Sequence, residues 1–182
     1  MERMFYHFDS TGYLNTIGVA PVDWLNAIES GQLNTGIIER LIYGDYSPNF
    51  HFPIEFVVED GRKVRDVIEM RSICAFLISN RIKALFETNK LTGWQPYDVI
   101  IKKKDGSLLP GFCGFSVIGR RPDRSHRENV PDFFRPDSSM LGIVCSQRVV
   151  DILKANKIKD FTYELICEDD YVHIYNKINY LL

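Results

Sequence analysis

Residues 79–94 read SNRIKALFETNKLTGW, and 67 positions later residues 146–161 read SQRVVDILKANKIKDF. A serine, an arginine, an asparagine and a lysine are identical in the two segments, and the apolar positions correspond in kind. Apolar residues recur three and four positions apart in each segment, which predicts an amphipathic helix. Ser79 and Ser146 stand directly before these helices, where a hydroxyl oxygen can accept a hydrogen bond from a first-turn amide. The chain therefore contains two similar helical units.

Each predicted helix carries an arginine in its first turn, Arg81 in the first unit and Arg148 in the second. A cation at this position faces the positive end of the helix dipole, which costs about 0.3–1 kcal/mol. We therefore expect each arginine to have a compensating partner. That partner is either a surface carboxylate, with the arginine stem packed on the sheet, or an anionic molecule that the protein binds.

Apolar runs over 73–78 and 140–145 precede the two helices, and extended segments follow at 94–101 and 161–167. Further strands are expected over 4–8, 52–58, 108–118 and 171–175. Short helices are expected over 21–31 and 64–70, and 37–43 fits either a helix or a strand. The pattern predicts an α+β fold, mainly antiparallel sheet with a few short helices.

The chain of 182 residues is expected to form a single domain over 1–182, with possible halves at 1–70 and 71–182. The second half would hold the two repeated strand-helix-strand units. Two copies are too few for a solenoid. The repeat is either a duplication or a shared pattern of helix capping.

Composition places the chain among ordinary globular proteins, with 45% hydrophobic and 25% charged residues. The formal net charge of −2 argues against a general nucleic-acid binder, which usually has a marked positive excess. The N-terminal residues lack the apolar core of a signal peptide, and no apolar run approaches the ~18 residues of a membrane span. We therefore expect a cytoplasmic protein without membrane contact.

No pattern in the sequence predicts catalysis, a metal or a cofactor. The cysteines form no C-x-x-C pair and are interpreted as reduced core residues. The histidines have no ligand spacing, and no glycine-rich phosphate loop is present. Cys113, followed by His126 in the next loop, is the one candidate nucleophile, but its apolar neighbours favour a strand position. The four cysteines are Cys74, Cys113, Cys145 and Cys167, and the four histidines are His7, His51, His126 and His173.

Residues 119–139 form the least regular region, with three prolines and several arginines, and we expect a surface loop there. Phe133 and Phe134 stand side by side within it. Adjacent aromatic residues in a loop either pin the loop to the core or anchor a binding partner. Since aromatic anchors dominate interface energies, both are candidate partner-binding residues.

Three motifs occur in a fixed order over about residues 20–118. They are Pro21-x-x-Trp24-x-x-x-Ile28-x-x-Gly31, then Arg65-Asp66-Val67-Ile68, then Ile78-Ser79-x-Arg81-x-x-x-Leu85-Phe86 followed by Leu91-x-Gly93-Trp94 and Tyr97-x-Val99. Together they resemble a family of bacterial immunity proteins from polymorphic-toxin systems, related to a myxobacterial-type domain of unknown function. Most of the matching positions are packing residues, and the family offers no catalytic residues to carry over.

The resemblance implies a non-enzymatic protein that binds a cognate toxin domain and occludes its active site. Many such toxins have basic clefts, so an acidic patch on the inhibitor would speed association and add specificity. The candidate patch comprises Glu164, Glu168, Asp169 and Asp170. Two alternatives stay open: a ligand- or protein-binding module of another pathway, and an enzyme of unrecognised class.

Overall fold

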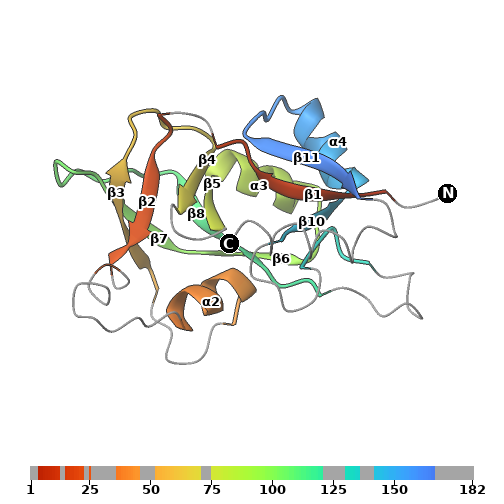
Figure 1. The fold of residues 1–182 in the computed structure, drawn as a ribbon, viewed down its shortest axis with the longest axis horizontal. Coiled ribbons are helices and arrows are strands. Elements are labelled where there is room, and N and C mark those ends of the chain that lie inside the picture. Colours follow the sequence, from red (N-terminus) through yellow and green to blue (C-terminus); the bar gives the residue numbers. More distant parts are fainter. Residues whose placement is uncertain are drawn as a thin grey trace, which may run out of the picture.

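A computed structural model describes residues 4–12, 15–22, 25, 36–45, 52–70, 75–120, 130–135 and 142–166. These residues form two β-sheets, with helices α2, α3 and α4 packed against them (Figure 1). The elements are β1 (Phe5–Ser10), β2 (Gly18–Pro21), α2 (Gly36–Tyr43), β3 (Ile54–Asp60), β4 (Val67–Met70), β5 (Ala75–Ser79), α3 (Asn80–Thr88), β6 (Trp94–Tyr97), β7 (Val99–Lys102), β8 (Phe112–Val117), β9 (Phe133–Phe134), β10 (Val144–Ser146), α4 (Gln147–Ala155) and β11 (Phe161–Ile166).

The smaller sheet has the strand order β11-β1-β10-β9 and is antiparallel throughout. The larger sheet has the order β6-β8-β5-β4-β2-β3-β7, in which the pairs β2–β4 and β3–β7 are parallel and the others antiparallel. Its two edge strands, β6 and β7, are consecutive parts of one extended segment, with only Asp98 between them. This segment bends from one edge to the other, so the larger sheet is nearly closed like a barrel. The α+β prediction is confirmed, whereas the barrel-like closure was not predicted.

The repeat seen in the sequence is a repeat of tertiary structure. We define unit 1 as β4, β5, α3, β6 and β8, and unit 2 as β9, β10, α4, β11 and β1. The strand order β6-β8-β5-β4 in one sheet corresponds to β11-β1-β10-β9 in the other. The registers agree as well, because Ser79 pairs with Phe112 and Ser146 pairs with Phe5. Unit 2 therefore takes its β1 strand from the N-terminal part of the chain.

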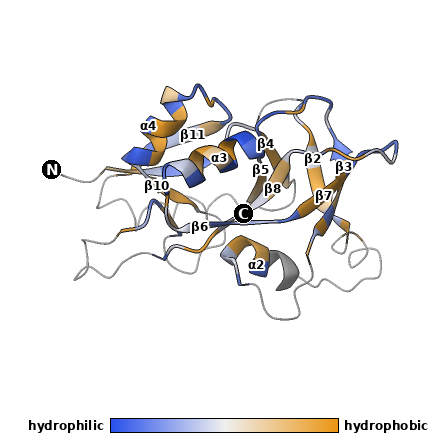
Figure 2. Ribbon diagram, turned by 180° about the vertical axis from the view of Figure 1, so that it is seen from behind, coloured by the Kyte–Doolittle hydropathy of each residue, from blue (hydrophilic) through white to orange (hydrophobic). Residues whose placement is uncertain are grey.

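The two units share one hydrophobic core, because each helix presents buried residues toward it. These are Ile82 and Phe86 from α3, and Val149, Val150 and Leu153 from α4. Figure 2 shows that both helices carry apolar and polar residues, as expected for helices with one buried face.

Aromatic rings fill the space between the units. Phe8 of β1 stacks on Phe161 of β11 with ring centroids 4.3 Å apart. The corresponding rings of unit 1, Phe115 and Trp94, stack at 6.0 Å. A second core lies inside the curved larger sheet and includes Leu41 and Ile42 of α2. The repeated pattern therefore extends from the helices to the ring pairs of the core.

One segment differs in type from the sequence prediction. Residues 64–70 were expected to form helical turns, but Val67–Met70 is strand β4, between β5 and β2 in the larger sheet. A short apolar run in the middle of a sheet is buried on both faces, so periodicity does not distinguish it from a buried helix. The ambiguous run at 37–43 is helical, as part of α2. The predicted helix at 21–31 and strand at 171–175 lie largely or wholly outside the described residues.

Candidate functional site

The arginines of the two helices are used to join the units. In unit 1, Arg81 donates from Nη1 to Asp66 Oδ2 at 3.0 Å, and from Nη2 to the backbone oxygen of Asn156 at 2.7 Å. Asn156 is the C-cap residue of α4, so the arginine of one helix satisfies a carbonyl at the end of the other. This contact also places the cation near the negative end of the α4 dipole, which offsets its position in the first turn of α3.

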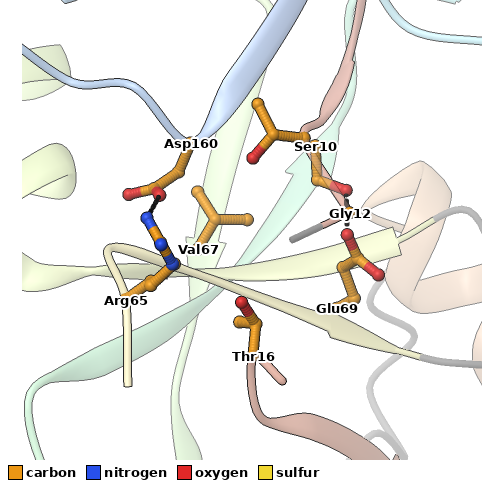
Figure 3. Close-up of a pocket in the computed structure, with 8 residues that line it drawn as sticks. Ser10, Gly12, Thr16, Arg65, Val67, Glu69 and Asp160 are labelled. Atoms are coloured by element: carbon orange, nitrogen blue, oxygen red, sulfur yellow. Dashed lines mark hydrogen bonds and ion pairs between the residues drawn. The ribbon is translucent and has the colours of Figure 1, made fainter. Parts of the chain in front are cut away.

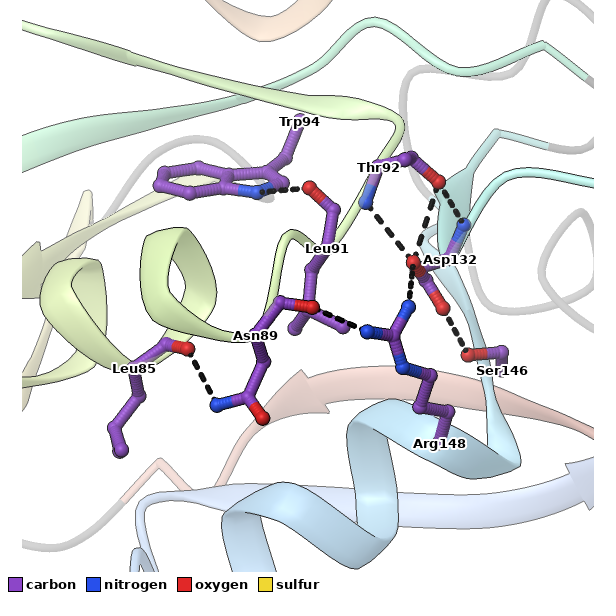
Figure 4. Close-up of polar contacts among 8 residues, drawn as sticks. All are labelled: Leu85, Asn89, Leu91, Thr92, Trp94, Asp132, Ser146 and Arg148. Carbon is purple, nitrogen blue, oxygen red and sulfur yellow. Dashed lines mark hydrogen bonds and ion pairs between the residues drawn. The ribbon is translucent and has the colours of Figure 1, made fainter.

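Unit 2 makes the reciprocal contact. Arg148 donates from Nη1 to Asp132 Oδ2 at 3.2 Å, and from Nη2 to the backbone oxygen of Asn89, the C-cap residue of α3 (Figure 4). We call these two sets of contacts the arginine bridges. The expectation of a carboxylate partner for each arginine is thus confirmed, with Asp66 in one bridge and Asp132 in the other.

The two bridges differ in how deeply the aspartate is buried. The Asp132 side chain is 10% exposed and accepts hydrogen bonds from Thr92 N, Thr92 Oγ1, Ser146 Oγ and Arg148. The Asp66 side chain is 23% exposed and accepts from Ser79 Oγ and Arg81. Asp132 therefore accepts more hydrogen bonds than Asp66 and joins more segments of the chain.

The serine N-caps are confirmed in position, but only one of them caps with its side chain. Ser79 Oγ accepts a hydrogen bond from Ile82 N at 3.3 Å, as the sequence predicted. Ser146 occupies the N-cap position of α4 without a side-chain cap, and its hydroxyl donates to Asp132 as the hydroxyl of Ser79 donates to Asp66. Both serines therefore contribute to the arginine bridges, and Ser79 also caps its helix.

Beside the arginine bridges, each unit has a corner where the turn after its helix meets a neighbouring strand end. In unit 1 the backbone oxygen of Gly93 accepts from Ile118 N at 3.0 Å and from Gly119 N at 2.9 Å. A Cβ atom on Gly93 or Gly119 would lie 1.9 or 2.0 Å from the backbone oxygen of Phe133. The same Cβ on Gly93 would lie 2.8 Å from Pro131 Cβ. We call this tightly packed arrangement the closed corner.

The corresponding place in unit 2, which we call the open corner, is less tightly packed. Its backbone bond is preserved, since Thr11 N donates to the oxygen of Asp160 at 3.0 Å. Aligning the two units by sequence repeat and by strand register shows which residues correspond. Asp160 corresponds to Gly93, Gly12 to Gly119, Arg65 to Pro131 and Val67 to Phe133. A Cβ atom on Gly12 would meet only Glu69 Oε1, at 3.7 Å.

The space left at this open corner is a shallow recess with room for about one water molecule (Figure 3). Two polar pairs flank it. Arg65 Nη1 lies 3.3 Å from Asp160 Oδ1 on one side, and Ser10 Oγ donates to Glu69 Oε1 at 2.5 Å on the other. With one guanidinium and two carboxylates, the lining has a formal charge of −1. The lining residues are Ser10, Thr11, Gly12, Thr16, Arg65, Val67, Glu69 and Asp160.

The size of the recess limits what it can bind. Pockets for metabolites and cofactors usually enclose about 300–1,000 Å³. The recess is far smaller and has room for about one water molecule. Its lining combines carboxylates, hydroxyls and one arginine, so no nucleophile–base pair of the serine–histidine or cysteine–histidine type lines it. Recognition of a polar group is the chemistry that this arrangement offers.

The residues predicted from sequence as partner-binding do not line the recess. Phe133 and Phe134 form strand β9 and are 0% and 2% exposed. The ring of Phe133 contacts those of Phe8, Phe86 and Phe115, so this pair pins its segment to the core. That is the other of the two alternatives drawn from the sequence.

Of the four residues in the predicted acidic patch, only Glu164 lies in the described part of the chain. Glu164 is exposed on β11, opposite His7 of β1. Glu168, Asp169 and Asp170 lie outside the described residues. The recess itself was missed, although the repeat contained one signal for it, because an aspartate at 160 stands where the first copy has Gly93. Its other residues come from segments that the sequence repeat does not include.

The candidate nucleophile Cys113 lies buried in β8. Burial raises the pKa of its thiol to about 11, and burial also raises the pKa of Cys145 far above the ordinary value. Since the thiolate is the reactive form, about one Cys113 in a thousand is ionised at pH 8. His126, the proposed base, is outside the described residues.

We therefore predict that neither buried thiol reacts with Ellman's reagent in the native protein at pH 8. The measurement uses a Cys74→Ser, Cys167→Ser background, because those two cysteines lie outside the described residues. In denaturant both remaining thiols should react within minutes. Rapid native reaction at Cys113 would contradict the buried position and revive the enzyme alternative.

Among the described residues, no three histidine, cysteine or acidic side chains are grouped so that they could hold a metal ion. None of the described helices is long and apolar enough to cross a membrane. No protein-family model matches the chain, and no curated protein matches it.

Proposed function

We propose that this chain is a cytoplasmic, non-enzymatic immunity protein that binds a cognate bacterial toxin domain and neutralises it by occlusion. The observation that carries the proposal is the open corner, a polar surface formed by the pairs Arg65–Asp160 and Ser10–Glu69 where the two units meet. The fold does not require these polar pairs, since the closed corner keeps the same backbone arrangement with Gly93 packed against Pro131 and the backbone of Phe133. Such a shallow polar surface is suited to contact with another protein rather than to enclosing a metabolite.

The family resemblance supports the same conclusion. Three of its motif residues, Asp66, Ser79 and Arg81, form one arginine bridge, so the motif specifies the joint between the two units. That joint fixes the relative position of the sheets that border the recess. A preorganised surface loses less conformational entropy on binding, which favours tight occlusion without chemistry.

The charge of the surface supports a basic partner. The recess has a formal charge of −1, and Glu164 is exposed on β11, the strand that begins directly after Asp160. Glu168, Asp169 and Asp170, which follow in the sequence, are the other acidic residues of the proposed patch. An acidic edge would steer a toxin with a basic cleft toward the inhibitor.

The test is growth rescue. The C-terminal domain encoded by the gene directly upstream is expressed from an inducible promoter, with and without this chain. We expect growth arrest by the domain alone, normal growth with the chain, and a complex that copurifies. A catalytically inactive toxin domain should bind equally well, as occlusion requires. Equal arrest with and without the chain, and no complex, would overturn the proposal and favour a binding module of another pathway.

A further inference from the structure

We infer that the outer edge of β11 binds an extended, lysine- or arginine-bearing segment of the toxin domain, which adds to the smaller sheet as a further strand. The identity of this partner rests on the proposed function. Three observations carry the inference: the direction of the backbone groups of β11, the different chemistry of the same edge in unit 1, and the side chains exposed on the two faces of β11.

Strand β11 lies at the end of the smaller sheet, where β1 is its only neighbour among the described strands (Figure 1). All of its residues pair with β1 in one continuous register. Thr11 N donates to the backbone oxygen of Asp160, and backbone groups alternate in direction along an antiparallel strand. The N–H and C=O groups of Phe161, Tyr163 and Leu165 therefore point away from β1, toward the outer edge.

A second hydrogen bond gives the same direction. Phe8 stands opposite Tyr163, but its N–H donates the other way, to the oxygen of Ile143 at 2.8 Å. Phe8 and Tyr163 thus form a pair without backbone hydrogen bonds between them, and the backbone groups of Tyr163 face outward. Outward groups of this kind are the donors and acceptors that an added strand uses in recognition of extended peptides.

Unit 1 treats the same edge differently. By the repeat spacing and the matching registers, β6 corresponds to β11, with Pro96 in the place of Tyr163 and Asp98 in the place of Leu165. Proline lacks the N–H that an added strand would bond, and prolines and charged residues commonly protect edge strands from unwanted pairing. β11 has neither device at these two positions, so its edge is suited to pairing where that of β6 is not.

An apolar row lies beside this edge. Phe161, Tyr163 and Leu165 alternate onto the face that packs on the shared core, but Leu165 is 52% exposed. Tyr6 stands opposite Leu165, and Met4, which is 47% exposed, has its sulfur 4.0 Å from the Tyr6 hydroxyl. A strand added to β11 would cover part of this row with its own apolar side chains.

The opposite face selects the charge of the added strand. Thr162 and Glu164 are exposed there, opposite Asp9 and His7 of β1. With two carboxylates, this face is acidic, and a lysine or arginine beside Glu164 would form a favourable cross-strand pair. A second copy of this chain would instead bring two more carboxylates to the same face of a continuous sheet. Charge therefore favours a basic strand from another protein.

The first test is backbone hydrogen exchange of the free ¹⁵N-labelled chain, followed by NMR. We expect the amides of Tyr163 and Leu165 to exchange at least about tenfold faster than those of Thr162 and Glu164, which point toward β1. Equally slow exchange at all four positions would show that the outer edge is already covered and would overturn the inference. If that protection were lost on dilution, the covering partner would be a second copy.

The second test adds a probe strand, an acetylated and amidated hexapeptide of alternating lysine and valine. The matching peptide of alternating glutamate and valine, at the same ionic strength, is the control for charge. We expect the basic peptide to give saturable shifts at β11 and to slow exchange at Tyr163 and Leu165 by about tenfold. The acidic peptide should do neither. Equal effects of the two peptides would overturn the choice of a basic strand, and no effect of either would overturn strand addition.

Two variants of one exposed residue separate the backbone from the side chain. Leu165→Pro removes an outward N–H, whereas Leu165→Ala keeps that N–H and shortens the side chain. The proline variant should bind the basic peptide about tenfold more weakly than the alanine variant, the loss of one hydrogen bond. Leu108→Ala, at a leucine that is 59% exposed on the hairpin after β7, should bind like the wild type. Equal binding by the proline and alanine variants would overturn recognition through the backbone.

Unchanged slow exchange at Thr162 and Glu164 shows that β11 is intact in each variant, and the comparison of the two peptides on the wild-type chain does not depend on the variants. The peptide measurements need no toxin, so the two proposals can fail separately. Binding of the basic peptide without growth rescue would support strand addition at this edge and count against the immunity function. Equal growth rescue by wild type and Leu165→Pro, with no slowed exchange at Tyr163 in the complex, would support immunity and overturn the use of this edge by the toxin.

Discussion

Replacing Asp132 with alanine is expected to lower the free energy of unfolding by about 3 kcal/mol. The carboxylate is 10% exposed and accepts four hydrogen bonds, from the backbone and side chain of Thr92, from Ser146 and from Arg148. Its removal leaves these donors buried or half-buried without acceptors. Urea denaturation followed by tryptophan fluorescence, to which Trp94 at the shared core contributes, measures the change.

The matched control is Asp66→Ala at the other arginine bridge. Asp66 is more exposed and accepts two hydrogen bonds, from Ser79 and Arg81, so its loss should cost about 1 kcal/mol. Water can replace the lost acceptor there. Equal costs for the two alanine variants would show that the bridges contribute alike and that the burial of Asp132 has no energetic consequence.

Much of the fold was predictable because local signals agreed with the tertiary structure. Ser79 and the apolar face at Ile82 and Phe86 are short-range features, and they specified α3 correctly. The same pattern specified α4. The first-turn arginines also indicated that partners must exist, since an uncompensated cation there is unfavourable.

The remainder depends on contacts between distant segments. In unit 1, β5 pairs with β8, and in unit 2 the matching strand β10 pairs with β1. β1 and β10 are more than a hundred residues apart in the chain. Sequence periodicity does not reveal a pairing over such a distance. The recess needs Ser10, Arg65 and Asp160 at one place, which only the complete fold provides. Phe133 and Phe134 were ambiguous for the same reason, because the rings that contact them include Phe8 and Phe5 of the distant strand β1.

The correspondence of the units is more extensive than a shared capping pattern requires. Lys90 and Lys157 both have a positive φ, of 51° and 56°, directly after the asparagine C-caps. The strand order, the registers and the reciprocal arginine contacts also match. Two helices with similar caps would not by themselves produce matching sheets, so the agreement favours duplication of the whole unit. The open corner is then the place where the two copies have diverged in chemistry while keeping one backbone.

The closed corner gives the other large expected effect. Gly93→Ala should lower the free energy of unfolding by about 4 kcal/mol, or prevent folding, for two reasons that add. Gly93 has φ +83°, which disfavours any L side chain, and its new Cβ would lie 1.9 Å from the backbone oxygen of Phe133. Because that oxygen belongs to a strand backbone, it cannot move aside as a flexible side chain can. Urea denaturation and the yield of soluble protein measure the outcome.

Gly106→Ala separates the two reasons. Gly106 has φ +81°, nearly the same as Gly93, but a Cβ there meets nothing within 4 Å. It should therefore cost only the backbone term, about 1 kcal/mol. The difference between the two variants measures the steric closure of the corner. If both glycines tolerate alanine equally, the backbone of Phe133 does not press on Gly93, and the contrast between a closed and an open corner loses its basis.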